Sequence, residues 1–204
     1  MIDLYTWGTP NGQKVSIMLE ACRLHYSVHP IDILNNEQFE DDFLKVSPNN
    51  KIPAIVDPDG PSGDSISLFE SGAILIYLAD KTGEFLPPEG TERYQVLQWL
   101  MWQMGGFGPF LGQAHHFNRF APEKVPYAIK RYKDEANRLW GVLNTQLTGR
   151  QFVCDELTIA DFAIYPWAAR FEWQEIDKTA FPAVNTWMEQ MAELPFVERG
   201  MQVP

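Results

Sequence analysis

Cysteine is scarce in this chain. Only Cys22 and Cys154 occur among 204 residues, and their separation fits neither a disulfide framework nor a metal-binding knuckle. This usage is typical of a protein from a reducing compartment, and we expect a cytoplasmic location. Long apolar runs are also missing, because none reaches the ~18–20 residues that a bilayer-spanning helix needs. The sequence therefore predicts a soluble protein that has no membrane segment.

Basic residues are few as well. The chain has 16 lysines and arginines against 27 aspartates and glutamates, which gives a net charge of −11. Such a surface repels phosphate backbones and anionic lipid, so we expect neither a nucleic acid nor a membrane as partner. An anionic small ligand would need a local positive potential within this unfavourable overall field.

Hydrophobic residues, at 45% of the chain, are sufficient for one large core or two smaller ones. The first 82 residues alternate short strand patterns with amphipathic helix patterns. We expect strands over residues 2–6, 26–33, 54–56 and 66–68, and helices over residues 11–24, 38–45 and 71–81. This βαβαββα order is typical of a thioredoxin-like domain.

The remainder of the chain is helical in pattern. Residues 83–90 carry two prolines and two glycines and are predicted to be a linker. Helices are expected over residues 93–105, 127–147, 159–173 and 183–194. The fold class predicted is therefore α/β plus all-α. The thioredoxin-like domain covers residues 1–82, and the all-helical C-terminal domain covers residues 91–204.

Four glycines lie within residues 104–112, in the first of these helical stretches. Glycine costs roughly 1 kcal/mol in a helix interior, which leaves two interpretations open. Either something packs closely against this backbone, or one helix ends and another begins. Nearby, His115 and His116 would point about 100° apart on a helix. No third ligand is evident, so we expect no metal site.

The run Thr9-Pro10-Asn11-Gly12 directly follows the first predicted strand. A redox protein of this strand–turn–helix form would place Cys-x-x-Cys at that turn, but here the turn contains no cysteine. Any thiol at this position must come from a bound ligand. Thr9 and Asn11 would offer it a hydroxyl, an amide and a helix N-terminus, together worth about 1–3 kcal/mol in favour of a thiolate. The alternative is an ordinary Asn-Gly turn.

Two further motifs could hold a small peptide. A cis Ile52–Pro53 bond would turn the Ile52 main chain outward to pair with an extended ligand, although Pro53 could also be a plain turn proline. Glu70 and Ser71 begin a predicted helix, where unpaired N–H groups attract anions. A carboxylate beside a hydroxyl there suits an amino-acid head group, although an N-cap followed by an acid is the commoner arrangement.

Other candidates for thiol chemistry are weaker. Tyr5 has a hydroxyl that could activate a thiol, but it lies in the first strand, before the turn. Cys22 falls on the apolar stripe of the first helix and is expected to serve packing. Cys154 has no basic neighbour to activate it, and it precedes a capping box at Thr158 and Asp161 that we regard as a folding signal.

Taken together, these strings resemble the cytosolic glutathione transferases over essentially the whole chain. Within that superfamily the chain most resembles the nu class, the bacterial glutathione-dependent disulfide-bond oxidoreductases, and the related fungal Ure2-like branch. The strings that carry the resemblance are YTWGTPNGQK, SPNNKIPAIVD, LFESGAILIYL and WQMGGFGPFLGQAHHFN. The second and third are typical of the whole superfamily, whereas the first and fourth are more specific.

The resemblance implies a two-fold homodimer and a set of ligand contacts. Thr9 and Asn11 would lie at the glutathione sulfur. The expected glutathione-binding residues are Gln38 and Lys51 at the glycyl end, Ile52 at the cysteinyl backbone, Glu70 and Ser71 at the γ-glutamyl head, and Arg131 from the helical domain.

The resemblance also implies an activity. Members of this class are expected to bind two glutathione molecules, or glutathione disulfide, per site and to reduce small disulfides, with peroxide reduction as a further activity. Glutathione would then be a co-substrate, and neither a metal nor a protein cysteine would be needed. The alternatives are a conventional transferase that conjugates glutathione to electrophiles, and a non-catalytic interaction module with the same fold.

Overall fold

The computed structural model describes all 204 residues and divides them into two compact units. The first unit comprises residues 1–88 together with residues 194–204, and the second comprises residues 89–193. The helical unit ends at residue 193, and the last residues of the chain belong to the first unit. This differs from our expectation, which assigned everything after residue 90 to the helical domain.

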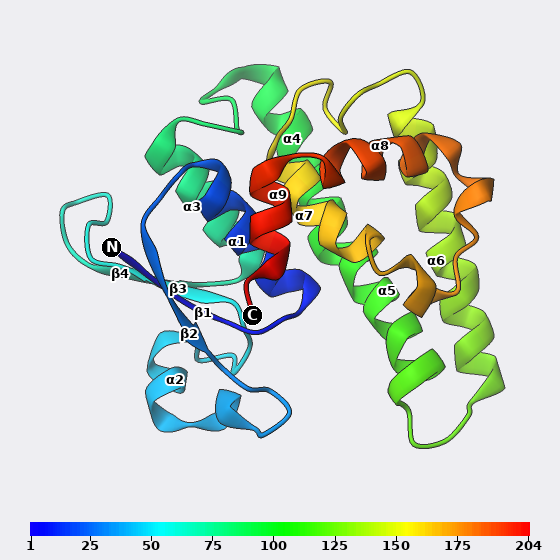
Figure 1. Ribbon diagram of the computed structural model, residues 1–204, viewed down its shortest axis with the longest axis horizontal. Coiled ribbons are helices and arrows are strands. Elements are labelled where there is room, and N and C mark those ends of the chain that lie inside the picture. The colour runs from blue at the N-terminus through cyan, green and yellow to red at the C-terminus, as the bar shows by residue number, and fades with distance from the viewer. The chain divides into compact units, whose positions relative to one another are not determined.

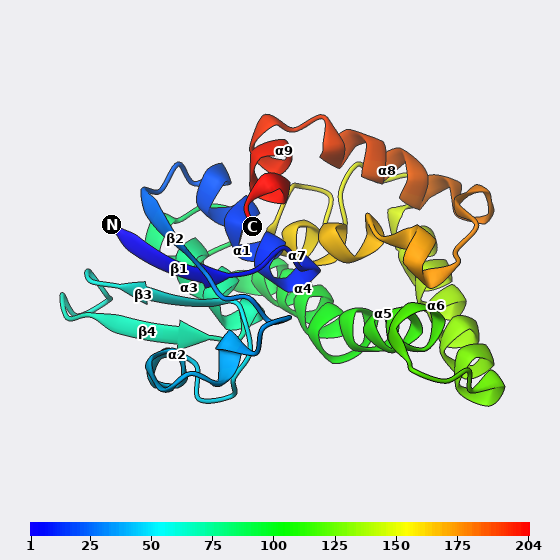
Figure 2. The same ribbon diagram turned by 60° about the horizontal axis from the view of Figure 1, so that its bottom comes forward.

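A four-stranded mixed sheet forms the centre of the first unit (Figure 2). Its strands are β1 (Ile2–Thr6), β2 (Tyr26–Pro30), β3 (Ala54–Asp57) and β4 (Ile66–Phe69), in the order β2-β1-β3-β4. β1 runs parallel to β2 and antiparallel to β3, and β3 runs antiparallel to β4. The thioredoxin-like arrangement predicted from the sequence is confirmed.

The helices of this unit are α1 (Pro10–Ala21), α2 (Asp41–Val46), α3 (Ser71–Thr82) and α9 (Pro195–Gln202). A 3₁₀ turn at Glu37–Phe39 precedes α2, so the single short helix expected over residues 38–45 is in fact two pieces. α1 packs against α3 and α9. Its Val15, Met18 and Leu19 are fully buried, as the apolar stripe predicted.

Helix α9 was missed by the sequence analysis, which ended the last helix at residue 194. It lies along α1, as Figure 1 shows for the red and blue helices near the C-terminus. Gly200 permits this approach, because a Cβ there would come within 2.6 Å of the Ile17 backbone nitrogen. Ser16 Oγ donates to the Gly200 carbonyl at 2.6 Å. Because these contacts join residues that are far apart in the sequence, no local sequence pattern predicts them.

The second unit is entirely helical, as expected. It contains α4 (Gly90–Trp102), α5 (Gly108–His115), α6 (Pro126–Leu147), α7 (Ile159–Ala168) and α8 (Pro182–Ala192). Single π-helical turns at Gln103–Phe107 and His116–Phe120 flank α5, and 3₁₀ turns lie at Phe171–Gln174 and Lys178–Ala180. None of the helices in either unit combines the length and the hydropathy that a membrane span requires.

The glycine-rich stretch continues as helix instead of breaking. Gly105 and Gly106 lie in the π turn at Gln103–Phe107, and α5, which contains Gly108 and Gly112, follows directly. A Cβ at Gly108 would lie 2.6 Å from Gln103 Nε2 and 3.3 Å from the Trp167 indole nitrogen, and a Cβ at Gly112 would lie 3.2 Å from the Trp167 ring. Gly105 and Gly106 face open space. Close packing against the backbone, the first of the two interpretations, therefore holds for Gly108 and Gly112, and the close neighbours are Gln103 and Trp167 of the same unit.

Helix α7 begins with the capping box predicted at Thr158. Asp161 accepts from the Thr158 and Val153 N–H groups, each at 3.0 Å, and from the Trp187 indole at 3.0 Å. The helix ends at Ala168, five residues earlier than expected, where the chain turns toward the Phe171–Gln174 segment. Asp161 thus ties α7 to α8, which is a folding role.

Candidate active site

Sheet pairing brings the three sequence motifs to one end of the first unit. In the register of the sheet, Ala54 of β3 lies opposite Tyr5 of β1 and opposite Phe69 of β4. Because β3 is antiparallel to both neighbours, the chain leaving β1, the chain entering β3 and the chain leaving β4 share this edge. The turn at Thr9, the Ile52–Pro53 bond and the Glu70-Ser71 pair are those three segments.

Thr9 is the N-cap of α1. Its backbone is extended and its Oγ1 accepts a hydrogen bond from the Gly12 N–H at 3.3 Å. A hydroxyl that accepts one bond still has its own hydrogen to donate. Gly12 is required here, because a Cβ would collide with the Thr6 side chain and the Trp7 carbonyl. Asn11 is half-buried in the first turn, so a hydroxyl and an amide lie at one helix N-terminus.

The Ile52–Pro53 peptide bond is cis, as the sequence predicted. The preceding loop is held by Ser47 Oγ, which donates to the Lys51 carbonyl at 2.7 Å. Ile52 lies just before β3, and its main-chain groups enter none of the ladder pairs of the sheet. An extended peptide could add to this backbone by strand-like pairing. Lys51 is exposed at the same loop.

The start of α3 is strained at Glu70, which has φ 71° and ψ 108° although it carries a side chain. Such a conformation costs on the order of 1–3 kcal/mol and is characteristic of ligand clamps and active sites. The exposed Glu70 carboxylate can accept from an ammonium group. The adjacent Ser71 is the first residue of α3, where unpaired N–H groups favour an anion.

Sequence reasoning missed Lys14, which lies beneath this pair. Its side chain is 1% exposed, and its Nζ donates to Ser71 Oγ at 3.4 Å. Burial lowers the pKa of Lys14 to about 7, and attraction to Glu70 partly opposes that shift. A signal was present in the sequence: a lysine in the second turn of a helix, where the dipole disfavours a cation, beside an otherwise apolar stripe.

Two other predicted contacts lie in the same unit. Gln38 belongs to the 3₁₀ turn that follows β2 and is half-buried, and its Oε1 is buried without a hydrogen-bond partner. Tyr5 stacks on His29 with ring centroids 4.8 Å apart. Burial, followed by repulsion from Asp3, raises the pKa of Tyr5. Tyr5 thus forms part of the packing of β1, which gives no support to its role as the thiol activator.

Neither cysteine has the surroundings of a nucleophile. Burial raises the pKa of Cys22, whose Sγ lies 3.6 Å from Thr82 Oγ1. Burial and repulsion from Asp161 raise the pKa of Cys154 to about 12. Because the thiolate is the reactive form, both thiols are suppressed near neutral pH. The structure also contains no group of three or more histidine, cysteine or acidic side chains arranged to hold a metal ion.

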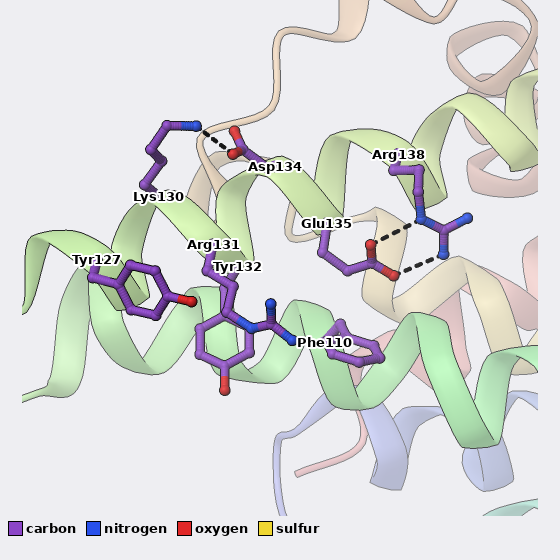
Figure 3. Close-up of a pocket in the computed structure, with 8 residues that line it drawn as sticks. All are labelled: Phe110, Tyr127, Lys130, Arg131, Tyr132, Asp134, Glu135 and Arg138. Carbon is purple, nitrogen blue, oxygen red and sulfur yellow. Dashed lines mark hydrogen bonds and ion pairs between the residues drawn. The ribbon is translucent and has the colours of Figure 1, made fainter.

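Arg131 lies on α6 in the second unit, where it lines a pocket of about 620 Å³ (Figure 3). The other cations of this pocket are neutralised, because Lys130 pairs with Asp134 and Arg138 forms two hydrogen bonds with Glu135. Arg131 has no such partner in Figure 3, and its side chain extends between the Tyr132 and Phe110 rings. Glu135, which pairs with Arg138, also attracts Arg131 electrostatically, and Arg131 is the cation of this pocket that is not held in an ion pair.

Comparison with known proteins identifies the family. The N-terminal domain of glutathione S-transferases matches residues 9–81, and the C-terminal domain matches residues 107–195. The chain belongs to the glutathione S-transferase family. The disulfide-bond oxidoreductase YfcG of Escherichia coli is 50% identical over 197 residues, covering 96% of this chain and 92% of that protein. This agrees with the branch that the sequence strings indicated.

Solved structures of the family are also similar. A glutathione transferase family member from Pseudomonas fluorescens, solved with two glutathione bound, matches with a TM-score of 0.96 and 46% identity, over 100% of this chain and 93% of that one. A glutathione transferase from Pseudomonas putida, with one glutathione disulfide bound per subunit, matches with a TM-score of 0.95 and 44% identity. That match covers 100% of this chain and 91% of that one.

Proposed function

We propose that this glutathione transferase is a glutathione-dependent disulfide-bond oxidoreductase whose reactive thiols both belong to the ligand. The observation that carries the proposal is the Thr9–Gly12 turn. It presents a hydroxyl and an amide at a helix N-terminus but contains no cysteine. The two-glutathione and glutathione-disulfide complexes of its relatives support the same assignment.

The proposed reaction has two exchange steps. The thiolate of one glutathione attacks a sulfur of the substrate disulfide, forming a mixed disulfide and releasing the first substrate thiolate. A second glutathione thiolate then attacks the glutathione sulfur of the mixed disulfide, which gives glutathione disulfide and the second substrate thiolate. Both released thiolates take up protons, so two electrons pass from two glutathione molecules to one disulfide.

Each predicted residue has a role in holding these thiols. Thr9 and Asn11 donate to the sulfur and stabilise its thiolate. Ile52 pairs with the cysteinyl backbone next to cis-Pro53, and Gln38 and Lys51 contact the glycyl carboxylate. Glu70 and Ser71 bind the γ-glutamyl head group, and Arg131 contributes positive charge from the helical unit. Lys51 and Arg131 thereby offset the net charge of −11 near an anionic ligand.

A homodimer in the cytoplasm completes the proposal. Tyr94 and Met101, seven residues apart on α4, are 71% and 52% exposed. Large apolar side chains on one helix face are typical of an interface with a second copy. Sedimentation equilibrium would measure the mass directly. A Tyr94→Glu, Met101→Glu variant should shift it toward that of one chain, and a wild-type mass of one chain would contradict the dimer.

The decisive experiment compares two activities of one preparation. Reduction of 2-hydroxyethyl disulfide by glutathione, coupled to glutathione reductase, should be fast, whereas conjugation of 1-chloro-2,4-dinitrobenzene should be slow. A Cys22→Ala, Cys154→Ala variant is the matched control and should keep the reductase rate within about twofold, because neither thiol is activated. Fast conjugation with slow reduction would instead identify a conventional transferase, and loss of activity in the folded double variant would overturn the ligand-thiol mechanism.

A further inference from the structure

Ser47 is a buried serine to which the proposed reaction so far assigns no role. It is the C-cap residue of α2, and it is 0% exposed. Its N–H donates to the Phe43 carbonyl at 2.8 Å, and its carbonyl accepts from the Asn50 N–H at 2.9 Å. Its Oγ donates to the Lys51 carbonyl at 2.7 Å. Three hydrogen bonds therefore fix Ser47, and the shortest of them reaches the residue before Ile52.

The segment between Ser47 and Ile52 is a tight turn. Asn50 has φ 49°, in the left-handed region that asparagine enters more readily than most residues. Lys51 is exposed, so burial of its own side chain does not orient its backbone. The bond from the Ser47 hydroxyl is therefore the contact that determines where the Lys51 carbonyl points.

The planarity of the peptide group transmits this orientation to Ile52. The bond between Lys51 and Ile52 is trans, and in a planar trans peptide unit the C=O and N–H groups point in opposite directions. Because the Lys51 carbonyl points at buried Ser47, the Ile52 N–H points away from the interior. None of the hydrogen bonds of the turns and loops uses this N–H, so it is open to a ligand.

We propose that Ser47 is a positioning residue for the main chain that binds glutathione. By fixing the peptide unit between Lys51 and Ile52, it directs the Ile52 N–H toward the cysteinyl carbonyl before the ligand arrives. Without the bond from Ser47 this unit could rotate, and only the molecules with the correct orientation would bind. The proposal rests on the proposed function, since it takes glutathione as the ligand. Ser47 is buried and acts only through the backbone.

Calorimetric titration with S-methylglutathione tests the effect on binding. Ser47→Ala should weaken the affinity about three- to tenfold, because the neutral hydrogen bond that orients the peptide unit is lost. Ser67→Ala is the matched control, since Ser67 Oγ donates to the Val46 carbonyl at 3.2 Å. It also removes a bond from a serine hydroxyl to a carbonyl at the end of α2, but that carbonyl is not in the peptide unit of Ile52. The affinity of this control should stay within about twofold of wild type.

Steady-state kinetics separate positioning from folding. In the reduction of 2-hydroxyethyl disulfide, Ser47→Ala should raise KM for glutathione about three- to tenfold and change kcat less than about twofold, since the donors to the sulfur are untouched. A purely structural role would instead reduce the folded fraction, which lowers kcat and leaves KM unchanged. If Ser47→Ala does not fold, Ser47→Cys supplies the same test in the titration, because a thiol is only a weak donor.

Three results would overturn the proposal. They are an unchanged affinity and KM in the folded Ser47 variant, an equal loss of affinity in Ser67→Ala, and a fall in kcat at constant KM. Failure of wild type to bind S-methylglutathione would instead refute the proposed function, and the role of Ser47 would be refuted with it.

Discussion

Thr9 combines an observed structural role with a proposed chemical one in the same side chain. Its Oγ1 caps α1 by accepting from Gly12, while the hydroxyl hydrogen remains for a ligand. Asn11 adds an amide in the same turn. In the proposed reaction these donors at the start of a helix would favour the thiolate form of a bound glutathione. Lys14, on the same helix, donates to Ser71 Oγ and so links α1 to the start of α3.

Replacing Thr9 tests the thiolate contact. Thr9→Ala should lower kcat/KM for disulfide reduction about 10- to 100-fold, because a hydrogen bond to a charged group contributes about 1.5–3 kcal/mol. The dissociation constant of glutathione should change less than about threefold. Thr9→Ser keeps the hydroxyl and should retain most activity. It also controls for loss of the helix cap, which costs about 1 kcal/mol of stability. Equal losses in turnover and affinity would remove Thr9 from the thiol.

Helix α9 stabilises helix α1 by packing against it and by accepting hydrogen bonds from its side chains. Its Gly200 lies against the backbone of Ile17, and two side chains of α1, Gln13 and Ser16, donate to carbonyls of α9. The helix that carries Thr9 and Lys14 is therefore held by the last residues of the chain. A family model that ends at residue 195 does not include this contact.

Substitution at Gly200 should loosen that support. Gly200→Ala places a Cβ against the α1 backbone, and overpacking of this kind costs about 1–3 kcal/mol of unfolding free energy. Gly105→Ala is the matched control, because a Cβ there meets open space and should be neutral or slightly stabilising. Denaturant titration of both variants measures the difference. Equal stability would show that α9 adapts to the added methyl group.

At the scale of the whole molecule, acid sensitivity should depend on a buried histidine. His115 stacks on Trp167 with ring centroids 5.5 Å apart, and its Nε2 has no hydrogen-bond partner. Burial, together with repulsion from Arg170 and Arg119, lowers the pKa of His115 to about 4. An unfolded histidine has a pKa near 6.5. Between this value and pH 4, His115 binds a proton in the unfolded chain but not in the folded protein.

Stability should therefore fall as pH drops from about 6.5 to 4, and this one group should account for up to about 2–3 kcal/mol of the loss. His115→Phe should remove that contribution, so its unfolding free energy should depend less on pH in this window. His116→Phe replaces the neighbouring exposed histidine and should follow wild type. Parallel pH profiles for wild type and His115→Phe would show that His115 accepts a proton inside the folded protein.

The sequence by itself determined the alternation of strands and helices, the capping box at Thr158 and the three motifs of the site. Each of these is a local pattern of periodicity, turn residues or caps. The Ile52–Pro53 bond could be predicted only because the neighbouring motifs gave it a context. The chemistry of the turn followed from residue types alone, since a site without cysteine must obtain its sulfur elsewhere.

Only the tertiary structure decided the burial of Lys14, the strain at Glu70 and the docking of α9. Lys14 and Ser71 are 57 residues apart, and Ser16 and Gly200 are 184 apart. Contacts at such separations depend on which strands pair and which helices pack, and no local pattern encodes them. A lysine's pKa likewise depends on the groups that exclude water from it, which are distant in sequence. The sequence thus predicted the groups that we propose to bind the ligand, and the fold determined which buried charge lies next to one of them.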